Sequence, residues 1–217
     1  MPAMDIVSTV ALAAGLGWAS GMRLYAVLFF LGVIEHAGAA TLPASLQVLA
    51  HPAVMAVSGT LFAIEFFVDK VPGLDTVWDA IQTFVRVPAG ALLAAYAISA
   101  DDSGFALAAG LLGGAVAAGT HLAKAGGRAV INASPEPFSN WAASLVEDFS
   151  ALAIVWLALK HPLLLLAALA VFVAVALWLL PKLWRGIRRA LESLRRLGSR
   201  RGGAETRNGA RPSSGRG

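Results

Sequence analysis

The sequence contains no cysteine among its 217 residues, and only 14% of them are charged. The lack of cysteine excludes disulfides, thiol catalysis and thiolate metal sites. Soluble chains are about one quarter charged and about half apolar, whereas this chain is 58% apolar with a mean hydropathy of +0.71. One core in so short a chain cannot hide that much apolar surface, so we expect lipid to be its solvent.

Basic residues are scarce before position 182. Only six of the 17 Lys and Arg lie there, together with 11 of the 13 Asp and Glu. The sequence pI near 10.0 is therefore a property of the C-terminal segment and does not indicate nucleic-acid binding. No basic region precedes the first apolar run, so we expect that run to be the first helix and not a cleaved signal peptide.

Enzyme motifs are lacking as well. The sequence has no Gly-rich nucleotide loop, no nucleophile elbow and no His-Glu-x-x-His pattern. Its four histidines are too scattered to predict a metal cluster. We therefore expect neither an enzyme nor a bound cofactor.

Six long apolar segments are present, at roughly residues 5–34, 52–69, 76–98, 104–131, 139–160 and 162–181. About 20 helical residues cross a bilayer. The third segment contains Asp79 and Arg86, and Pro88 should kink it, so it could cross fully, cross half-way or re-enter. The sequence predicts an all-α polytopic transmembrane bundle of about six helices over residues 1–184.

The distribution of basic residues predicts the orientation. If all six segments cross, Lys70, Lys124, Arg128 and the 11 basic residues from Lys182 onward share one side with the N-terminus. Only Lys160 falls on the other side. We therefore expect a multi-pass protein of the inner (plasma) membrane with both termini cytoplasmic.

An internal repeat is visible. The sequence ALAAGL occurs at residues 11–16 and again at 106–111. Each copy is followed by a helix that carries two acidic residues. Units at about 5–98 and 104–184 would hold three helices each, and an odd number of crossings would invert the second unit, as in many transporters.

The C-terminal segment changes in character at residue 185. Apolar residues at helical spacing among arginines predict a basic amphipathic helix over 185–198. Residues 199–217 are rich in Gly, Ser, Arg and Pro and are predicted to be disordered. We expect this segment to be attracted to anionic lipid headgroups.

Ionisable residues inside membrane segments cost about 2.5–3.5 kcal/mol each on insertion scales and are therefore candidate functional groups. Arg23 follows Ser20-Gly21, where glycine lets the helix unwind or another backbone approach. An Arg at a broken helix could hold an anionic group. It could equally be a structural partner of an acid on a neighbouring helix.

The acidic residues of the second segment, Glu65 and Asp69, share one helix face. Asp69 with the adjacent Lys70 fits an interfacial ion pair. Glu65 lies deeper, and its partner could be a cation, a proton or Arg23.

Glu147 and Asp148 lie near the centre of the fifth segment. If neither has a cationic partner, at least one should be protonated at neutral pH. A salt bridge to a basic residue of another helix would look identical in the sequence.

His121, Lys124 and Arg128 form one helical stripe, and Gly126-Gly127 is predicted to interrupt that helix. The stripe could hold phosphate or carboxylate, or be an ordinary cytoplasmic collar. The predicted binding residues are Arg23, Glu65, Asp69, His121, Lys124, Arg128, Glu147 and Asp148. Glu65, Glu147 and Asp148 would be the ligands if a metal cation binds.

Three stretches together resemble a bacterial membrane family named domain of unknown function 4126 (DUF4126). They are residues 19–25 (ASGMRLY), residues 65–75 (EFFVDKVPGLD), and residues 124–148, which include KAGGRAVIN and SPEPFSN. The resemblance covers about residues 10–165. It implies a multi-helix membrane protein and brings no established activity.

Three functions are compatible with these features. The first is a small secondary transporter or exchanger of an ion or small charged solute, with buried carboxylates as the proton or cation site. The second is a protein that binds or flips an anionic phospholipid or polyprenyl phosphate, and the third is a non-transporting scaffold with paired charges. The expected partners are the bilayer and a small ion or solute; a homo-oligomer is compatible with the sequence.

Overall fold

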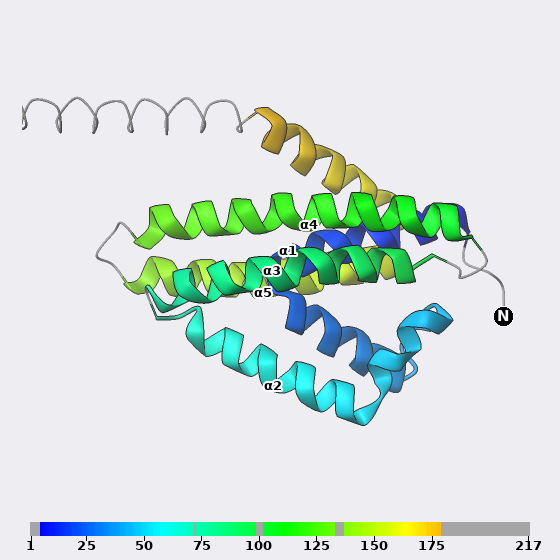
Figure 1. The fold of residues 1–217 in the computed structure, drawn as a ribbon, viewed down its shortest axis with the longest axis horizontal. Helices are drawn as coiled ribbons and strands as arrows, with labels where there is room; N and C mark the ends of the chain where they lie inside the picture. Colours follow the sequence, from blue (N-terminus) through cyan, green and yellow to red (C-terminus); the bar gives the residue numbers. More distant parts are fainter. Residues whose placement is uncertain (1–4, 72, 99–101, 133–136, 179–217) are drawn as a thin grey trace, which may run out of the picture. The chain divides into compact units, whose positions relative to one another are not determined.

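The computed structural model describes residues 5–71, 73–98, 102–132 and 137–178. The chain divides into a helical unit up to Val171 and a second unit from Phe172, of which residues 172–178 are described. Within the described ranges every regular element is a helix, which confirms the all-α prediction (Figure 1). The predicted amphipathic helix 185–198 and basic tail 199–217 lie outside the described residues.

The helices follow the predicted apolar segments closely. They are α1 (Ile6–His36), the short 3-10 helix η1 (Ala44–Ala50), α2 (Pro52–Val68), α3 (Leu74–Tyr96), α4 (Ser103–Asn132), α5 (Pro137–Lys160) and the helix Pro162–Trp178. By length and composition, α1, α4 and α5 could each cross a membrane, and η1 with α2, bent by 70°, forms a fourth candidate. Six crossing helices stay a prediction.

α1 is broken at its centre. Arg23 has non-helical backbone angles (φ −146°, ψ 73°) and divides the helix into two arms, which Figure 1 shows pointing back toward the same end. Gly15 on the first arm packs against Ala158 near the end of α5. Ala39, just after the second arm, accepts a hydrogen bond from Lys160 (3.4 Å). Both ends of α1 therefore lie with the C-terminal end of α5, and Arg23 is the apex.

This geometry corrects the predicted path of the first segment. If all six segments crossed, the first would cross once, and the N-terminus would lie on the same side as Lys70 and the loop between α2 and α3. In the structure the first arm starts at the opposite end, because the helix turns back at Arg23. The suggestion that α1 breaks beside Gly21 is confirmed.

α1 nevertheless organises the bundle. It contacts α2, α3, α4 and α5, and Leu12, Leu16, Val27 and Leu31 along its two arms are fully buried. Dispersion and close packing, not the hydrophobic effect, hold helices together in lipid. A helix that contacts neighbours on every side makes the most dispersion contacts and has the most closely packed surface.

Small residues set the approach of α1 to α4. Gly17 lies against Gly113, and Gly21 lies against the backbone of Ala117, so closely that a Cβ on Gly21 would be 2.3 Å from the Ala117 carbonyl oxygen. Small residues four apart are the usual device for such contact in membranes. The pairing also shows that the first arm runs parallel to α4. Inverted units would make these two helices antiparallel, so the predicted inversion is not confirmed.

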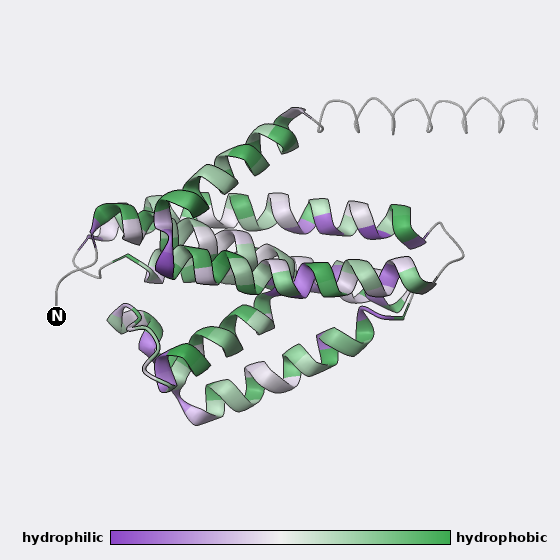
Figure 2. Ribbon diagram, turned by 180° about the vertical axis from the view of Figure 1, so that it is seen from behind, coloured by the Kyte–Doolittle hydropathy of each residue, from purple (hydrophilic) through white to green (hydrophobic). Residues whose placement is uncertain are grey.

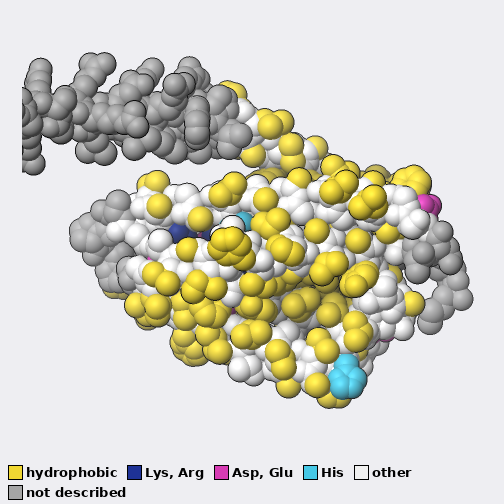
Figure 3. All heavy atoms as spheres, viewed as in Figure 1, with side chains coloured by type: hydrophobic (Ala, Val, Ile, Leu, Met, Phe, Trp, Pro, Cys, Tyr) yellow, Lys and Arg dark blue, Asp and Glu magenta, His cyan; other side chains and the backbone are white. Residues whose placement is uncertain are grey.

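The surface of the helical unit is largely hydrophobic while charges lie inside. In α3 the buried face carries Asp75, Asp79 and Arg86, and the opposite face exposes Val77, Ile81 and Phe84. Figure 2 shows mostly hydrophobic ribbons, with hydrophilic turns in the C-terminal half of α4, and Figure 3 shows hydrophobic side chains over the visible face. Soluble proteins have the reverse distribution of charge. The chain is a membrane protein.

The α1–α4 contact predicts that Gly21→Ala lowers stability. Overpacking against a backbone atom costs about 1–3 kcal/mol, so the apparent melting temperature in detergent should fall. Gly119→Ala is the matched control, because a Cβ there meets nothing within 4 Å and alanine favours a helix. Equal melting temperatures for the two variants would contradict the contact.

Candidate functional site

Ionisable side chains from all five long helices meet in one buried network. They lie at the break of α1, the end of α2, the first half of α3, the second half of α4 and the first half of α5. The network contains six acids, four basic residues and one histidine: Glu65, Asp69, Asp75, Asp79, Glu147, Asp148, Arg23, Arg86, Lys124, Arg128 and His121. All eight predicted binding residues are among them.

Arg23 is the central cation of this network and is fully buried. Its Nη1 pairs with Asp69 and lies 3.9 Å from Glu65 Oε1. Its Nη2 donates to the Ser144 hydroxyl (2.9 Å) and the Ser144 carbonyl (3.1 Å). Its Nε lies 2.9 Å from Asp148 Oδ1. One guanidinium at the apex of α1 thus joins the end of α2 to the start of α5.

Asp69 is an interior residue, which corrects the predicted interfacial pair with Lys70. Its side chain is fully buried, and Oδ2 lies 3.0 Å from Lys124 Nζ. The Lys70 ammonium instead lies 2.9 Å from the centre of the Phe66 ring and donates to the Phe66 carbonyl. Arg23 and Lys124 attract the Asp69 carboxylate inward, so the sequence neighbour does not become its partner.

α3 contributes charged side chains to the network that were not among the predicted binding residues. Asp75, Asp79, Gln82 and Arg86 follow one another at spacings of four, three and four residues and form the buried face. Arg86 pairs with Glu65, and its Nη1 donates to Asp79 Oδ1 (2.8 Å). This spacing was a signal in the sequence, because residues three and four apart share a helix face.

The basic stripe of α4 is occupied by carboxylates of the protein itself. Lys124 Nζ lies 3.0 Å from Asp69 Oδ2 and 3.1 Å from Asp79 Oδ1. Arg128 forms a two-point pair with Glu147, from Nε to Oε1 (2.8 Å) and from Nη2 to Oε2 (2.9 Å). α4 is continuous from Ser103 to Asn132, so the predicted interruption at Gly126-Gly127 is wrong.

His121 is held as a neutral side chain. Arg86 can only donate, so Nδ1 of His121 accepts from Arg86 Nη1 (3.1 Å). The Thr83 hydroxyl donates to the Asp79 carbonyl (3.0 Å), which leaves its oxygen to accept from Nε2–H of His121 (2.7 Å). The ring therefore carries one proton, on Nε2.

Asp75 ties the network to the end of the bundle where α3 begins. Its Oδ1 accepts from the backbone N–H groups of Gly73 (2.8 Å) and Thr76 (2.7 Å) at the start of α3. The amide of Asn132, at the end of α4, donates to both carboxylate oxygens of Asp75 (3.0 and 2.9 Å). The ends of α3 and α4 are thereby joined beside the charged side chains.

The network carries an excess of negative charge. With every carboxylate ionised and His121 neutral, six acids face four basic residues, a net charge of −2. Among the described residues, nothing donates a hydrogen bond to the buried oxygens Glu65 Oε2, Asp69 Oδ1, Asp79 Oδ2 and Asp148 Oδ2. Buried negative charge of this kind favours uptake of a proton or a cation.

A metal centre is not formed by the acids that were predicted as ligands. Glu65, Glu147 and Asp148 each lie within 4.0 Å of Arg23, and Glu65 and Glu147 also pair with Arg86 and Arg128. In the part of the chain that the structure describes, no three His, Asp or Glu side chains come together to hold a metal ion.

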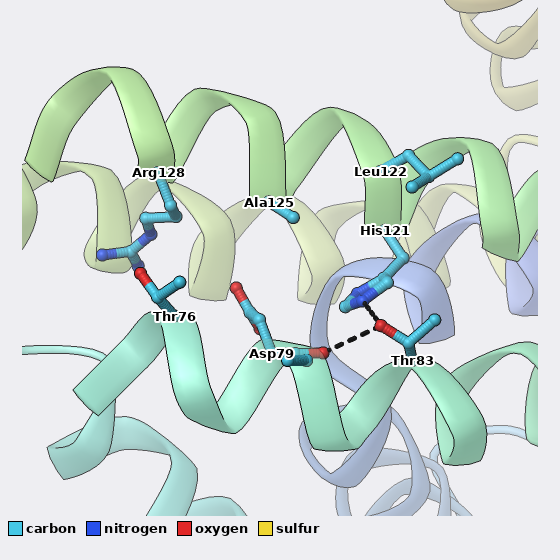
Figure 4. A pocket seen from close by; sticks show the side chains of 8 residues that line it. Thr76, Asp79, Thr83, His121, Leu122, Ala125 and Arg128 are labelled. Carbon is cyan, nitrogen blue, oxygen red and sulfur yellow. Dashed lines mark hydrogen bonds between the residues drawn. The ribbon is translucent and has the colours of Figure 1, made fainter. Parts of the chain in front are cut away.

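A cavity of about 180 Å³ adjoins the network between α3 and α4. Figure 4 shows Thr76, Asp79 and Thr83 reaching it from α3, and His121, Leu122, Ala125 and Arg128 from α4. Ala80 completes its lining. In Figure 3 a Lys or Arg side chain and a His side chain are visible in the hollow below α4. The cavity thus connects the surface with Asp79.

The fold and this network define a helical membrane protein with an ionic interior. The chain belongs to the family described as Domain of unknown function (DUF4126), whose model matches residues 10–182. That match confirms the resemblance carried by the three motif stretches. No curated protein and no solved structure matches the chain.

The network predicts a large loss of stability for Arg86→Met. Removing one partner of a buried ion pair costs about 3–5 kcal/mol, because Glu65 and Asp79 stay buried with one counter-charge fewer. Adding Glu65→Gln should recover part of the loss. Unfolding in detergent measures both effects, and Lys160→Met, at the exposed end of α5, is the control. A loss in Arg86→Met no larger than in this control would show that the pairs do not support the fold.

Proposed function

We propose that the protein is a small secondary transporter or exchanger of an ion or small charged solute, with the buried carboxylates as the proton or cation site. The observation that carries this proposal is the excess of acids over basic residues in the buried network, six against four. A scaffold needs only matched pairs. A group that alternates between two charge states needs an unmatched carboxylate, and this network contains more acids than cations.

The broken helix supports the same function. In secondary transporters, discontinuous helices end near the bilayer midplane and present their free backbone groups and a charged side chain to the site. α1 has this form, with Arg23 at the junction of its arms.

The proposal includes a membrane topology. α2, α3, α4 and α5 cross the bilayer, and α1 enters and leaves on one side. The ends of α2 and α4, with Lys70 and Arg128, face the cytoplasm by the positive-inside rule. α3 is compatible with crossing because its charged face contacts the network and its other face is apolar.

An anionic-lipid site on the basic stripe is less well supported by the geometry. Arg128 is engaged by Glu147, Asn140 and the Asp69 carbonyl, and Lys124 by Asp69 and Asp79. A lipid phosphate would have to displace these partners. We therefore propose that Lys124 and Arg128 balance the charge of the carboxylates within the network.

Glu147→Gln is predicted to abolish transport without unfolding the protein. Glu147 is the most accessible acid of the network, with 14% of its side chain exposed, and glutamine keeps an oxygen that can accept from Arg128. Proteoliposomes with an internal pH dye report proton flux when gradients of candidate solutes are imposed. We expect flux to fall at least tenfold with little change in melting temperature.

Asp102→Asn is the matched control, because Asp102 is exposed at the start of α4 and should leave flux unchanged. Flux indifferent to Glu147→Gln would reject the role of this carboxylate. Absence of flux in the wild type, together with charge-swapped pairs that restore stability, would reject the transporter and favour the non-transporting scaffold.

A further inference from the structure

We infer that the cavity between α3 and α4 binds a small organic cation with N–H donors, of the methylammonium or guanidinium class. The inference rests on the proposed function, since it names the class of solute that the transporter recognises. It is carried by Asp79, which lines the cavity and has one buried carboxylate oxygen without a donor among the described residues.

Asp79 supplies this oxygen. Asp79 is only 2% exposed. Its Oδ1 already pairs with Arg86 Nη1 (2.8 Å) and Lys124 Nζ (3.1 Å). Oδ2 is buried and accepts no hydrogen bond from the described residues. Figure 4 shows the Asp79 side chain extending from α3 toward α4, between Arg128 and His121. Asp79 is the one carboxylate among the residues that line the cavity, so it is the acid that a donor in the cavity would approach.

The other polar groups around the cavity do not offer a site for an anion. Arg128 already donates hydrogen bonds to Glu147, Asn140 and the Asp69 carbonyl. His121 is neutral and gives its only N–H to Thr83. The charged groups that line the cavity are therefore one carboxylate with an oxygen that lacks a donor, and one guanidinium whose three nitrogens all donate to other groups. A negatively charged hydrogen-bond acceptor binds a positively charged donor more strongly than a neutral one.

The remaining lining favours an organic ion over a metal ion. Thr76 and Thr83 contribute hydroxyl oxygens, and Ala80, Leu122 and Ala125 contribute carbon. Ca²⁺ and Mg²⁺ prefer a full shell of oxygen ligands, which this lining does not provide. The volume of about 180 Å³ is close to the roughly 150 Å³ cavity that accepts benzene. A cation of about six non-hydrogen atoms or fewer fits.

Binding of methylammonium chloride and guanidinium chloride to the purified full chain in detergent, by calorimetry, tests the inference. Tetramethylammonium chloride and sodium chloride are the comparison salts, because neither cation has an N–H donor. We expect saturable binding of the first two salts and none of the others. Equal responses to all four salts, or to none, would overturn the assignment.

Filling the cavity tests its location. Ala125→Leu places extra carbon in the cavity and touches no ion pair, and Ala80→Leu does so from α3 if the first variant is unstable. Ala123→Leu is the matched control on the exposed side of α4. We expect affinity to fall at least tenfold in the filled variants and to be kept in the control. Unchanged affinity in a folded, cavity-filled variant would overturn the site.

Uptake of labelled methylammonium into proteoliposomes separates this inference from the proposed function. Binding without uptake or any other flux would keep the cavity site and reject the transporter. Glu147-dependent proton flux without methylammonium binding would keep the transporter and reject the cavity as its cation site.

Discussion

The fold depends on neutralising one buried guanidinium. Arg23 sits at the broken centre of α1, where neither water nor lipid can solvate its charge, and an unpaired charge in such a place is very costly. Its counter-charges come from other helices, with Asp69 at the end of α2 and Asp148 on α5. These helix ends must therefore converge on the apex of α1. The two arms of α1 then cover the rest of the interior with apolar side chains.

Small residues make this convergence possible. Gly17 and Gly21 allow α1 to lie against Gly113 and Ala117 of α4 with backbones in contact. That approach brings Lys124 and Arg128, further along α4, within reach of Asp69 and Glu147. The hydrophobic face of each helix is left to the outside. The same arrangement thus explains both the apolar surface and the ionic interior.

The balance of charge links the fold to the proposed function. Pairing alone would be served by equal numbers of acids and bases, yet six acids meet four basic residues and a neutral histidine. The unmatched carboxylates lie both at the break of α1 and beside the cavity between α3 and α4. A proton or cation bound there changes the electrostatic energy of the whole network, because every member shares a partner with another. Such sharing provides a physical route from binding at Asp79 to the pairing at Arg23.

The sequence determined the helical class, the approximate bounds of the long helices and eight ionisable residues of the network, since hydropathy and the cost of burying an ionisable group can be judged segment by segment. It also indicated a break beside Gly21. Only the tertiary structure decided that α1 turns back on itself, that Asp69 pairs inward and not with Lys70, and that the first arm runs parallel to α4. It also brought Asp75, Asp79 and Arg86 of α3 into the network. Those features depend on which charges meet across helices, and a buried charge takes its partner from whichever helix packs against it.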